Sequence, residues 1–202
     1  MSYNIAVDGP AGAGKSTIAK AVAKRMNLIY VDTGSMYRAL ALFIVRQKIA
    51  LDDREKIIEK CGEADVTIRY EDGIQVVYLN GENVNAYLRT EEVGNAASAI
   101  SPIPEVRKKL VELQRKLAAE SDCIMDGRDI GTCVLPHAQK KVYLTASSEV
   151  RAKRRYEELQ AKGETCDLKK IQADIEERDY RDMHRETSPL KQAEDAVLVD
   201  TS

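Results

Sequence analysis

Short apolar runs alternate with amphipathic segments along most of this chain. Residues 5–7 are apolar and lead into a segment in which Ala19 and Ala23 belong to an apolar set at helical spacing, and residues 28–32 lead into a second such segment. An apolar strand followed by an amphipathic helix, repeated, is typical of a parallel sheet covered by helices. The start of the chain therefore predicts an α/β fold.

Three further apolar runs complete the predicted sheet, at residues 123–126, 141–146 and 196–200. Two strongly charged helical segments, residues 148–161 and 168–185, lie between the last two runs. We predict a three-layer sandwich of the phosphate-loop type, built on a five-stranded parallel sheet, with the two charged helices forming a short lid.

Residues 65–81 interrupt this alternation. Residues 65–70 and 74–79 have the pattern of two strands, Asp72-Gly73 between them is a turn signal, and Asn80-Gly81 marks a further turn. We predict an antiparallel insertion, either a hairpin or a three-stranded patch. Such an insertion is either a surface decoration or a mobile wall of a substrate cleft.

The length of 202 residues fits a single main domain. We divide this domain into three parts. The core takes about residues 1–50, 106–150 and 186–202, the insertion about residues 52–105, and the lid with its flanking helices about residues 151–185.

Composition and charge exclude several kinds of protein. The formal net charge of -2 argues against a dedicated binder of nucleic acid or of anionic membranes. No apolar run approaches the roughly 18 residues of a membrane span, and the four cysteines are scattered, which favours reduced thiols over a disulfide or zinc framework. We expect a soluble cytoplasmic protein, with His137 and His184 on its surface.

The strongest motif is Gly9-Pro10-Ala11-Gly12-Ala13-Gly14-Lys15-Ser16, which fits G-x-x-x-x-G-K-[ST] and is called the phosphate loop below. Glycines let the backbone curl so that amide groups point at phosphate oxygens, and the N-terminus of the following helix adds partial positive charge. Lys15 would neutralise the outer phosphates, and Ser16 would offer its hydroxyl to a magnesium ion. The motif predicts binding of a nucleoside triphosphate.

Polar residues also gather after two other predicted strands. Residues 32–38 follow one of them, and residues 127–132 follow the other, with two glycines bracketing Arg128 and Asp129. Because ligands collect at the carboxyl ends of parallel strands, residues 32–38 should lie near the phosphate loop, where a second substrate could bind. Asp129, like Asp182, would either bind a sugar or base or orient a neighbouring arginine.

Arg178, Arg181 and Arg185 fall within about 60° of one another on the last charged helix. One interpretation is a solvated helix with ion pairs four residues apart. We favour a lid that brings arginines to the triphosphate and excludes water, because a basic patch at residues 151–155 precedes this helix. An arginine supplied to phosphoryl transfer is typically worth about 10³–10⁵ in rate.

Taken together, the motifs of this chain resemble those of the bacterial cytidylate kinases, in order over essentially its whole length. They are Gly9 to Thr17, Asp32-Thr33-Gly34-Ser35-Met36-Tyr37-Arg38-Ala39, Asn95-Ala96-Ala97-Ser98, Asp126-Gly127-Arg128-Asp129-Ile130-Gly131-Thr132, Arg178-Asp179-Tyr180-Arg181-Asp182 and Ser188-Pro189-Leu190. The resemblance implies transfer of the ATP γ-phosphoryl group to CMP or dCMP with Mg²⁺, in pyrimidine nucleotide metabolism. We expect a monomer without nucleic-acid or membrane partners.

The resemblance also implies roles for individual residues. The ATP-binding set is Gly9, Pro10, Ala11, Gly12, Ala13, Gly14, Lys15, Ser16, Thr17 and Arg154, with Ser16 also contacting Mg²⁺. The CMP-binding set is Thr33, Arg38, Ser98, Arg107, Gly127, Arg128, Asp129, Arg178, Asp182 and Arg185. Within it, Ser98, Arg107 and Asp129 would read the cytosine. Lys15, Arg128 and Arg181 would be catalytic, without an obligatory general base, because the acceptor is already a phosphate oxyanion.

Three alternatives stay open. The first is a kinase of the same fold acting on AMP, UMP or shikimate, the second is a GTP-binding switch, and the third is a nucleic-acid-binding module. The absence of an Asn-Lys pair argues against the second, and the balanced charge argues against the third. The family usually continues beyond the position of Ser202 into another helix, so we expect a shortened chain or a missing helix, with more effect on stability than on chemistry.

Overall fold

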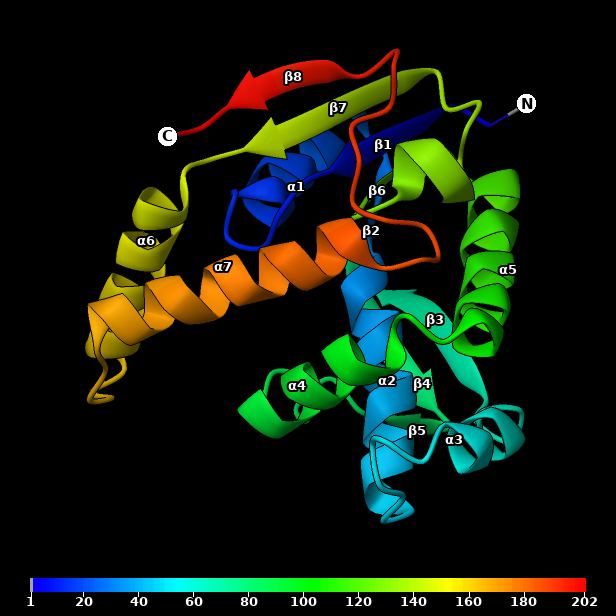
Figure 1. The fold of residues 1–202 in the computed structure, drawn as a ribbon. Helices are drawn as coiled ribbons and strands as arrows, with labels where there is room; N and C mark the ends of the chain where they lie inside the picture. The colour runs from blue at the N-terminus through cyan, green and yellow to red at the C-terminus, as the bar shows by residue number, and fades with distance from the viewer. Residues whose placement is uncertain (1) are drawn as a thin grey trace. The chain divides into compact units, whose positions relative to one another are not determined.

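A computed structural model describes residues 2–202 and confirms the α/β class (Figure 1). The main sheet has five strands in the order β2-β6-β1-β7-β8, and a second sheet has three strands in the order β3-β4-β5. The five strands are β1 (Asn4–Asp8), β2 (Ile29–Asp32), β6 (Cys123–Gly127), β7 (Lys140–Thr145) and β8 (Val197–Asp200). The predicted five-stranded parallel sheet is therefore confirmed.

The chain forms two compact units. The first contains residues up to Leu28 together with Asp122–Ser202, and the second contains Ile29–Ser121. The division into core, insertion and lid that the sequence predicts stays a prediction.

In the first unit, β1 is the central strand. It pairs in parallel with β6 on one side and with β7 on the other, and β7 pairs with β8. Ile5, Ala6 and Val7 are almost completely buried, as expected for a strand with neighbours on both sides. Asp8, the last residue of β1, stands in register with Gly127 of β6, so the carboxyl ends of these strands meet at one edge of the sheet.

Three α-helices belong to this unit. Helix α1 (Lys15–Met26) follows the phosphate loop and ends at Asn27, which adopts the left-handed conformation typical of a helix end. Helices α6 (Ser148–Ala161) and α7 (Leu168–His184) begin at the capping residues Ser147 and Asp167. They pack against each other, as Figure 1 shows, and confirm the two charged helices predicted from the sequence.

One element of the first unit was not predicted. After β6 the chain enters a short π-helical turn, η1 (Ile130–Val134), with Ile130 and Val134 buried at about one helical turn's spacing. The sequence suggested only a loop over residues 127–132, because two glycines in six residues favour irregular backbone.

The second unit contains four helices. They are α2 (Thr33–Arg46), α3 (Arg54–Cys61), α4 (Glu91–Ile100) and α5 (Pro104–Glu120). Helix α2 packs against α4 and contributes more buried apolar residues to the core of this unit than any other element does. Helix α2 confirms the second amphipathic segment predicted from the sequence. Helices α3 and α4 were missed because they are short and start at local caps, Asp53 and Thr90, rather than showing a long apolar period.

The insertion is a three-stranded antiparallel sheet of β3 (Val66–Glu71), β4 (Ile74–Leu79) and β5 (Glu82–Asn83). Asp72-Gly73 and Asn80-Gly81 form the two turns, and all four residues have positive φ, as tight two-residue hairpin loops require. Of the two predicted forms, the three-stranded patch is the correct one. Across residues 2–202, every helix is too short or too polar to span a bilayer.

Candidate active site

The phosphate loop connects β1 to α1 in a conformation that its glycines make possible. Gly9, Gly12 and Gly14 have φ values of 144°, 77° and 86°, a region that disfavours any residue with a Cβ atom. A Cβ on Gly9 would also lie only 1.9 Å from the carbonyl oxygen of Leu144. The motif therefore folds as the predicted strand, glycine turn and helix.

Lys15 turns back onto its own loop. Its Nζ donates a hydrogen bond of 2.8 Å to the carbonyl oxygen of Pro10, and only 7% of the residue is exposed. Burial, followed by repulsion from Arg128, lowers the pKa of the Lys15 ammonium group below its usual value. Phosphate oxygens at this position would stabilise the charged form, adding to the weaker attraction of Asp126 and Asp8.

Ser16 lies next to a carboxylate that the sequence analysis did not single out as a site residue. Its Oγ donates a hydrogen bond of 2.6 Å to Oδ2 of Asp126, which is buried near the end of β6. A hydroxyl and a carboxylate side by side form an oxygen donor set of the kind that Mg²⁺ prefers. Asp126 ends an apolar run at the edge of the sheet where ligands collect, and this signal could have identified it.

Asp8 ties the strand before the phosphate loop to the segment after β6. Its two carboxylate oxygens accept hydrogen bonds of 2.7 Å from the backbone N–H groups of Ile130 and Gly131. Burial raises the pKa of Asp8 to about 6, while these two hydrogen bonds act in the opposite direction. Sequence reasoning also missed Asp8, although it ends the central strand. It fixes the course of the chain beyond Arg128 and Asp129.

Two arginine–carboxylate pairs lie in this region, that of Arg185 buried and that of Arg128 partly buried. Arg128 Nε donates a hydrogen bond of 3.0 Å to Oδ2 of Asp182, and Arg185 Nη2 lies 3.6 Å from Oδ1 of Asp129. Arg185 is the C-cap residue of α7, and its Nε also donates to the carbonyl oxygen of Ser188 at 2.7 Å. Asp129 and Asp182 were each predicted either to bind a sugar or base or to orient a neighbouring arginine. Both have the arginine neighbour that the second role requires.

The other predicted arginines of the first unit differ in exposure. Arg178 is half-buried on α7, whereas Arg181 is exposed, and its Nε lies 3.7 Å from Oε1 of Glu177. Arg154 is exposed on α6 and donates to the carbonyl oxygen of Thr201. Arg181 thus forms the ion pair of the solvated-helix interpretation, and both Arg154 and Arg181 are accessible to a ligand from solvent.

In the second unit, Arg38 is held at the start of α2. Its Nη2 donates a hydrogen bond of 2.9 Å to Oδ2 of Asp32, which also caps α2 by accepting from Ser35 N. A Cβ on Gly34 would lie 3.1 Å from Nη1 of Arg38, so glycine leaves room for the guanidinium group. Thr33 is buried in the same turn.

Gln75 of β4 supports this turn from the antiparallel sheet. Its Oε1 accepts a hydrogen bond of 2.8 Å from Asp32 N, and its Nε2 donates one of 2.7 Å to Ser35 Oγ. The insertion therefore contacts the segment that carries Arg38, which favours the interpretation as a cleft wall over that as a surface decoration. No sequence signal distinguished Gln75 from the other polar residues of an alternating strand.

Arg107 and Ser98 lie where α4 leads into α5. Only 4% of Arg107 is exposed. Its Nη1 donates to the carbonyl oxygen of Ser101 at 3.4 Å, and its Cζ lies 5.6 Å from the ring centroid of Tyr37. Ser98 accepts a hydrogen bond of 3.1 Å through its carbonyl oxygen from Ser101 Oγ. Since Tyr37 directly precedes Arg38 in α2, the contact with Tyr37 brings Arg107 to the start of that helix.

A phosphate loop between the first strand and the first helix of a five-stranded parallel sheet defines the class of phosphate-loop nucleotide-binding proteins. Residues 5–202 match the family model described as cytidylate kinase, and the chain belongs to this family.

Curated relatives agree with this assignment. A cytidylate kinase from Caldicellulosiruptor bescii is 49% identical over 98% of this chain and 88% of its own length. A cytidylate kinase from Geobacillus sp. is 48% identical over 100% of this chain and 90% of its own length. A solved structure of an uncharacterized protein from Eubacterium ventriosum aligns with a TM-score of 0.50 and 11% identity, over 98% of this chain and 89% of that one, a likeness of fold alone.

Proposed function

We propose that this protein transfers the γ-phosphoryl group of ATP to CMP or dCMP, giving ADP and CDP or dCDP. Membership of the cytidylate kinase family supports the donor and the acceptor. The observation that carries the proposal is the grouping, at the carboxyl ends of β1 and β6, of the phosphate loop and the Ser16–Asp126 pair with the Arg128–Asp182 pair.

The phosphate loop and Lys15 would hold the ATP phosphates, with Arg154 approaching them from α6. Loop amides and the start of α1 favour anions, and Lys15 would exchange the carbonyl oxygen of Pro10 for phosphate oxygens. Ser16 and Asp126 fit a magnesium ion, which when bound neutralises charge on the β- and γ-phosphate oxygens.

Arg38, Arg128 and Arg185 would hold the phosphate of CMP, because arginine binds phosphate oxygens in pairs. In the structure each of the three lies beside an aspartate. These carboxylates neutralise and orient the individual guanidinium groups before the phosphate binds.

Recognition of the nucleoside would fall to other residues. Ser98, Arg107 and Asp129 would read the cytosine, Thr33 would add a polar contact near it, and Arg178 with Asp182 would reach the sugar. Gly127 would let the acceptor approach the backbone before Arg128.

Arg181 would bridge the donor and acceptor phosphates during transfer. Phosphoryl transfer depends on positioning and on stabilisation of charge spread over the phosphoryl oxygens, which a mobile, exposed arginine can supply on closure of α6 and α7. Closure would also exclude water, which would otherwise accept the phosphoryl group.

A coupled assay of ADP release with CMP, dCMP, UMP, AMP and shikimate as acceptors tests the proposal. CMP and dCMP should have the highest kcat/KM, and any other best acceptor would overturn it. Replacing ATP by GTP as the donor tests the guanine-nucleotide alternative. Three further expectations stay predictions: the cytoplasmic location, the monomeric state, and the lack of nucleic-acid or membrane partners. Size-exclusion chromatography with light scattering tests the monomeric state.

A further inference from the structure

Arg151, on the first turn of α6, differs from the basic patch in which the sequence analysis placed it. Only 4% of Arg151 is exposed, whereas residues 153–155 on the same helix are exposed. A buried guanidinium group is costly unless all of it is paired. The contacts of Arg151 therefore indicate what the chain uses it for.

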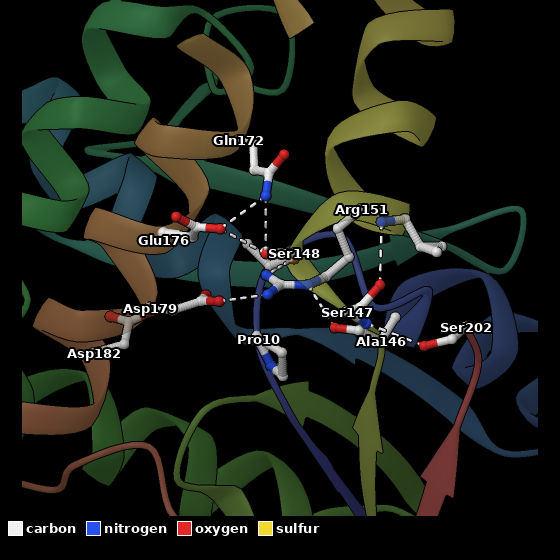
Figure 2. Close-up of polar contacts among 12 residues, drawn as sticks. Pro10, Ala146, Ser147, Ser148, Arg151, Gln172, Glu176, Asp179, Asp182 and Ser202 are labelled. Atoms are coloured by element: carbon white, nitrogen blue, oxygen red, sulfur yellow. Dashed lines mark hydrogen bonds and ion pairs between the residues drawn. The ribbon is translucent and has the colours of Figure 1, made fainter. Parts of the chain in front are cut away.

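The guanidinium group of Arg151 binds three separate elements, as Figure 2 shows in part. Nε donates to the carbonyl oxygen of Ala146, just after β7, at 2.8 Å. Nη1 donates to the carbonyl oxygen of Ala11 in the phosphate loop at 3.0 Å, and Nη2 donates to Oδ2 of Asp179 on α7 at 2.5 Å. One side chain thus joins the donor loop to the helix that carries Arg178 and Arg181.

The contact with Ala11 constrains the direction of the loop amides. In a trans peptide the C=O group and the following N–H group point in opposite directions. Anchoring the Ala11 carbonyl on Arg151 therefore turns the N–H of Gly12 away from Arg151. The side chain also covers Gly12 closely, since a Cβ there would lie 3.3 Å from Cβ of Arg151.

The contact with Asp179 belongs to a polar face of α7. Gln172, Glu176 and Asp179 are spaced four and three residues apart and so lie on one face. Figure 2 shows this face directed at the start of α6, where Ser148 Oγ donates to Oε1 of Glu176 at 2.7 Å. Three residues beyond Asp179, Asp182 accepts from Arg128. Helix α7 is therefore attached to the donor loop through Asp179 and to the segment after β6 through Asp182.

We propose that Arg151 is a positioning residue for phosphoryl transfer, which couples the phosphate loop to helix α7 so that closure of α6 and α7 brings Arg181 toward the loop in a defined direction. Through Ala11 it directs a loop amide, and through Asp179 it sets the rotation of α7 and hence the direction of Arg181. The proposal rests on the kinase function proposed above. Wild-type turnover of CMP tests that function separately, before any variant is compared.

The experiment compares Arg151→Lys and Asp179→Asn with wild type in steady-state kinetics, at a temperature where melting curves show each variant folded. Lysine cannot bind three acceptors in the planar arrangement of the guanidinium group. Arg151→Lys should therefore raise the KM for ATP and lower kcat, each by at least about tenfold. Asp179→Asn leaves the Ala11 contact in place, so it should lower kcat with less than about a threefold change in the KM for ATP.

The double variant should be no slower than Arg151→Lys alone, because both substitutions break the same contact, that between Arg151 and Asp179. Arg46→Lys is the matched control, since Arg46 forms an exposed, two-bonded ion pair with Glu82. It should leave both constants within about twofold of wild type. If Arg151→Lys lowers the melting temperature but leaves kcat and the KM for ATP within twofold of wild type, Arg151 has only a structural role and the proposal is overturned. If Arg151→Lys does not fold, an unchanged kcat in Asp179→Asn overturns the proposal by itself.

Discussion

The hydroxyl group of Ser16 donates a hydrogen bond of 2.6 Å to Asp126, which lies 110 residues further along the chain. Ser16 stands in the first turn of α1, and Asp126 stands near the end of β6. The local sequence around the two residues does not indicate that they lie close together in space. Their contact brings a hydroxyl and a carboxylate together at the position where the phosphate loop would present a magnesium-bound triphosphate.

This contact predicts that Asp126 affects the use of magnesium. Asp126→Asn should raise the Mg²⁺ concentration needed for half-maximal activity by about 10- to 100-fold, because the carboxylate charge that holds or orients the metal ligands is lost. Titration of activity with MgCl₂ at saturating ATP and CMP measures this. Asp174→Asn, an exposed carboxylate on α7, is the control, and equal curves for the two variants would remove Asp126 from the metal site.

Lys15→Ala should lower kcat by about 10²–10³, since removal of one group that stabilises transition-state charge typically has this effect. The melting temperature should stay close to that of wild type, because the hydrogen bond of Lys15 to Pro10 is local to the loop. Lys24→Ala, at the exposed end of α1, is the control. Near-normal turnover in Lys15→Ala would contradict the assigned role.

Arg181→Ala should lower kcat by about 10³, as expected for an arginine supplied to a transferring phosphoryl group. Because the side chain is 55% exposed and its ion pair with Glu177 is long, stability should not change measurably. Circular dichroism melting and single-turnover kinetics separate the two effects. Lys169→Ala on the same helix should behave as wild type, and the same result for Arg181→Ala would support the solvated-helix interpretation instead.

Asp129→Ala should reduce discrimination between CMP and UMP, because a site that binds an amino group rejects an analogue that lacks it. The observed pairing of Asp129 with Arg185 adds a second expectation, a higher KM for both acceptors. The ratio of kcat/KM values for CMP and UMP separates the two. If both acceptors weaken equally, Asp129 acts only by orienting Arg185.

The buried carboxylate of Asp8 predicts a pH effect on stability. Its pKa is raised to about 6 in the folded state, so its contribution to stability is complete below about pH 4 and is lost as the pH rises through 6. Between about pH 5 and pH 7 the free energy of unfolding of wild type should fall by about 1 kcal/mol more than that of Asp8→Asn. Urea unfolding at both pH values measures this difference, and parallel slopes would show that Asp8 ionises normally.

Local sequence patterns were sufficient for the five strands and for the longer helices. Buried parallel strands appear as continuous apolar runs, and Asp72-Gly73 and Asn80-Gly81 indicate tight turns wherever they occur between strands. Helices α3 and α4 and the π-helical turn η1 were not predicted, because their starts depend on single caps or on a contact such as that of Asp8 with Ile130 and Gly131.

The sequence by itself determined the phosphate loop, because its glycines, lysine and hydroxyl act within eight consecutive residues. Only the tertiary structure decided the partners of those residues. Asp126 reaches Ser16 and Arg151 reaches Ala11 from more than 100 residues away, and burial made Arg151 a link rather than part of a surface patch. Composition and periodicity do not encode such contacts, since they arise when the sheet brings the ends of distant strands to one edge.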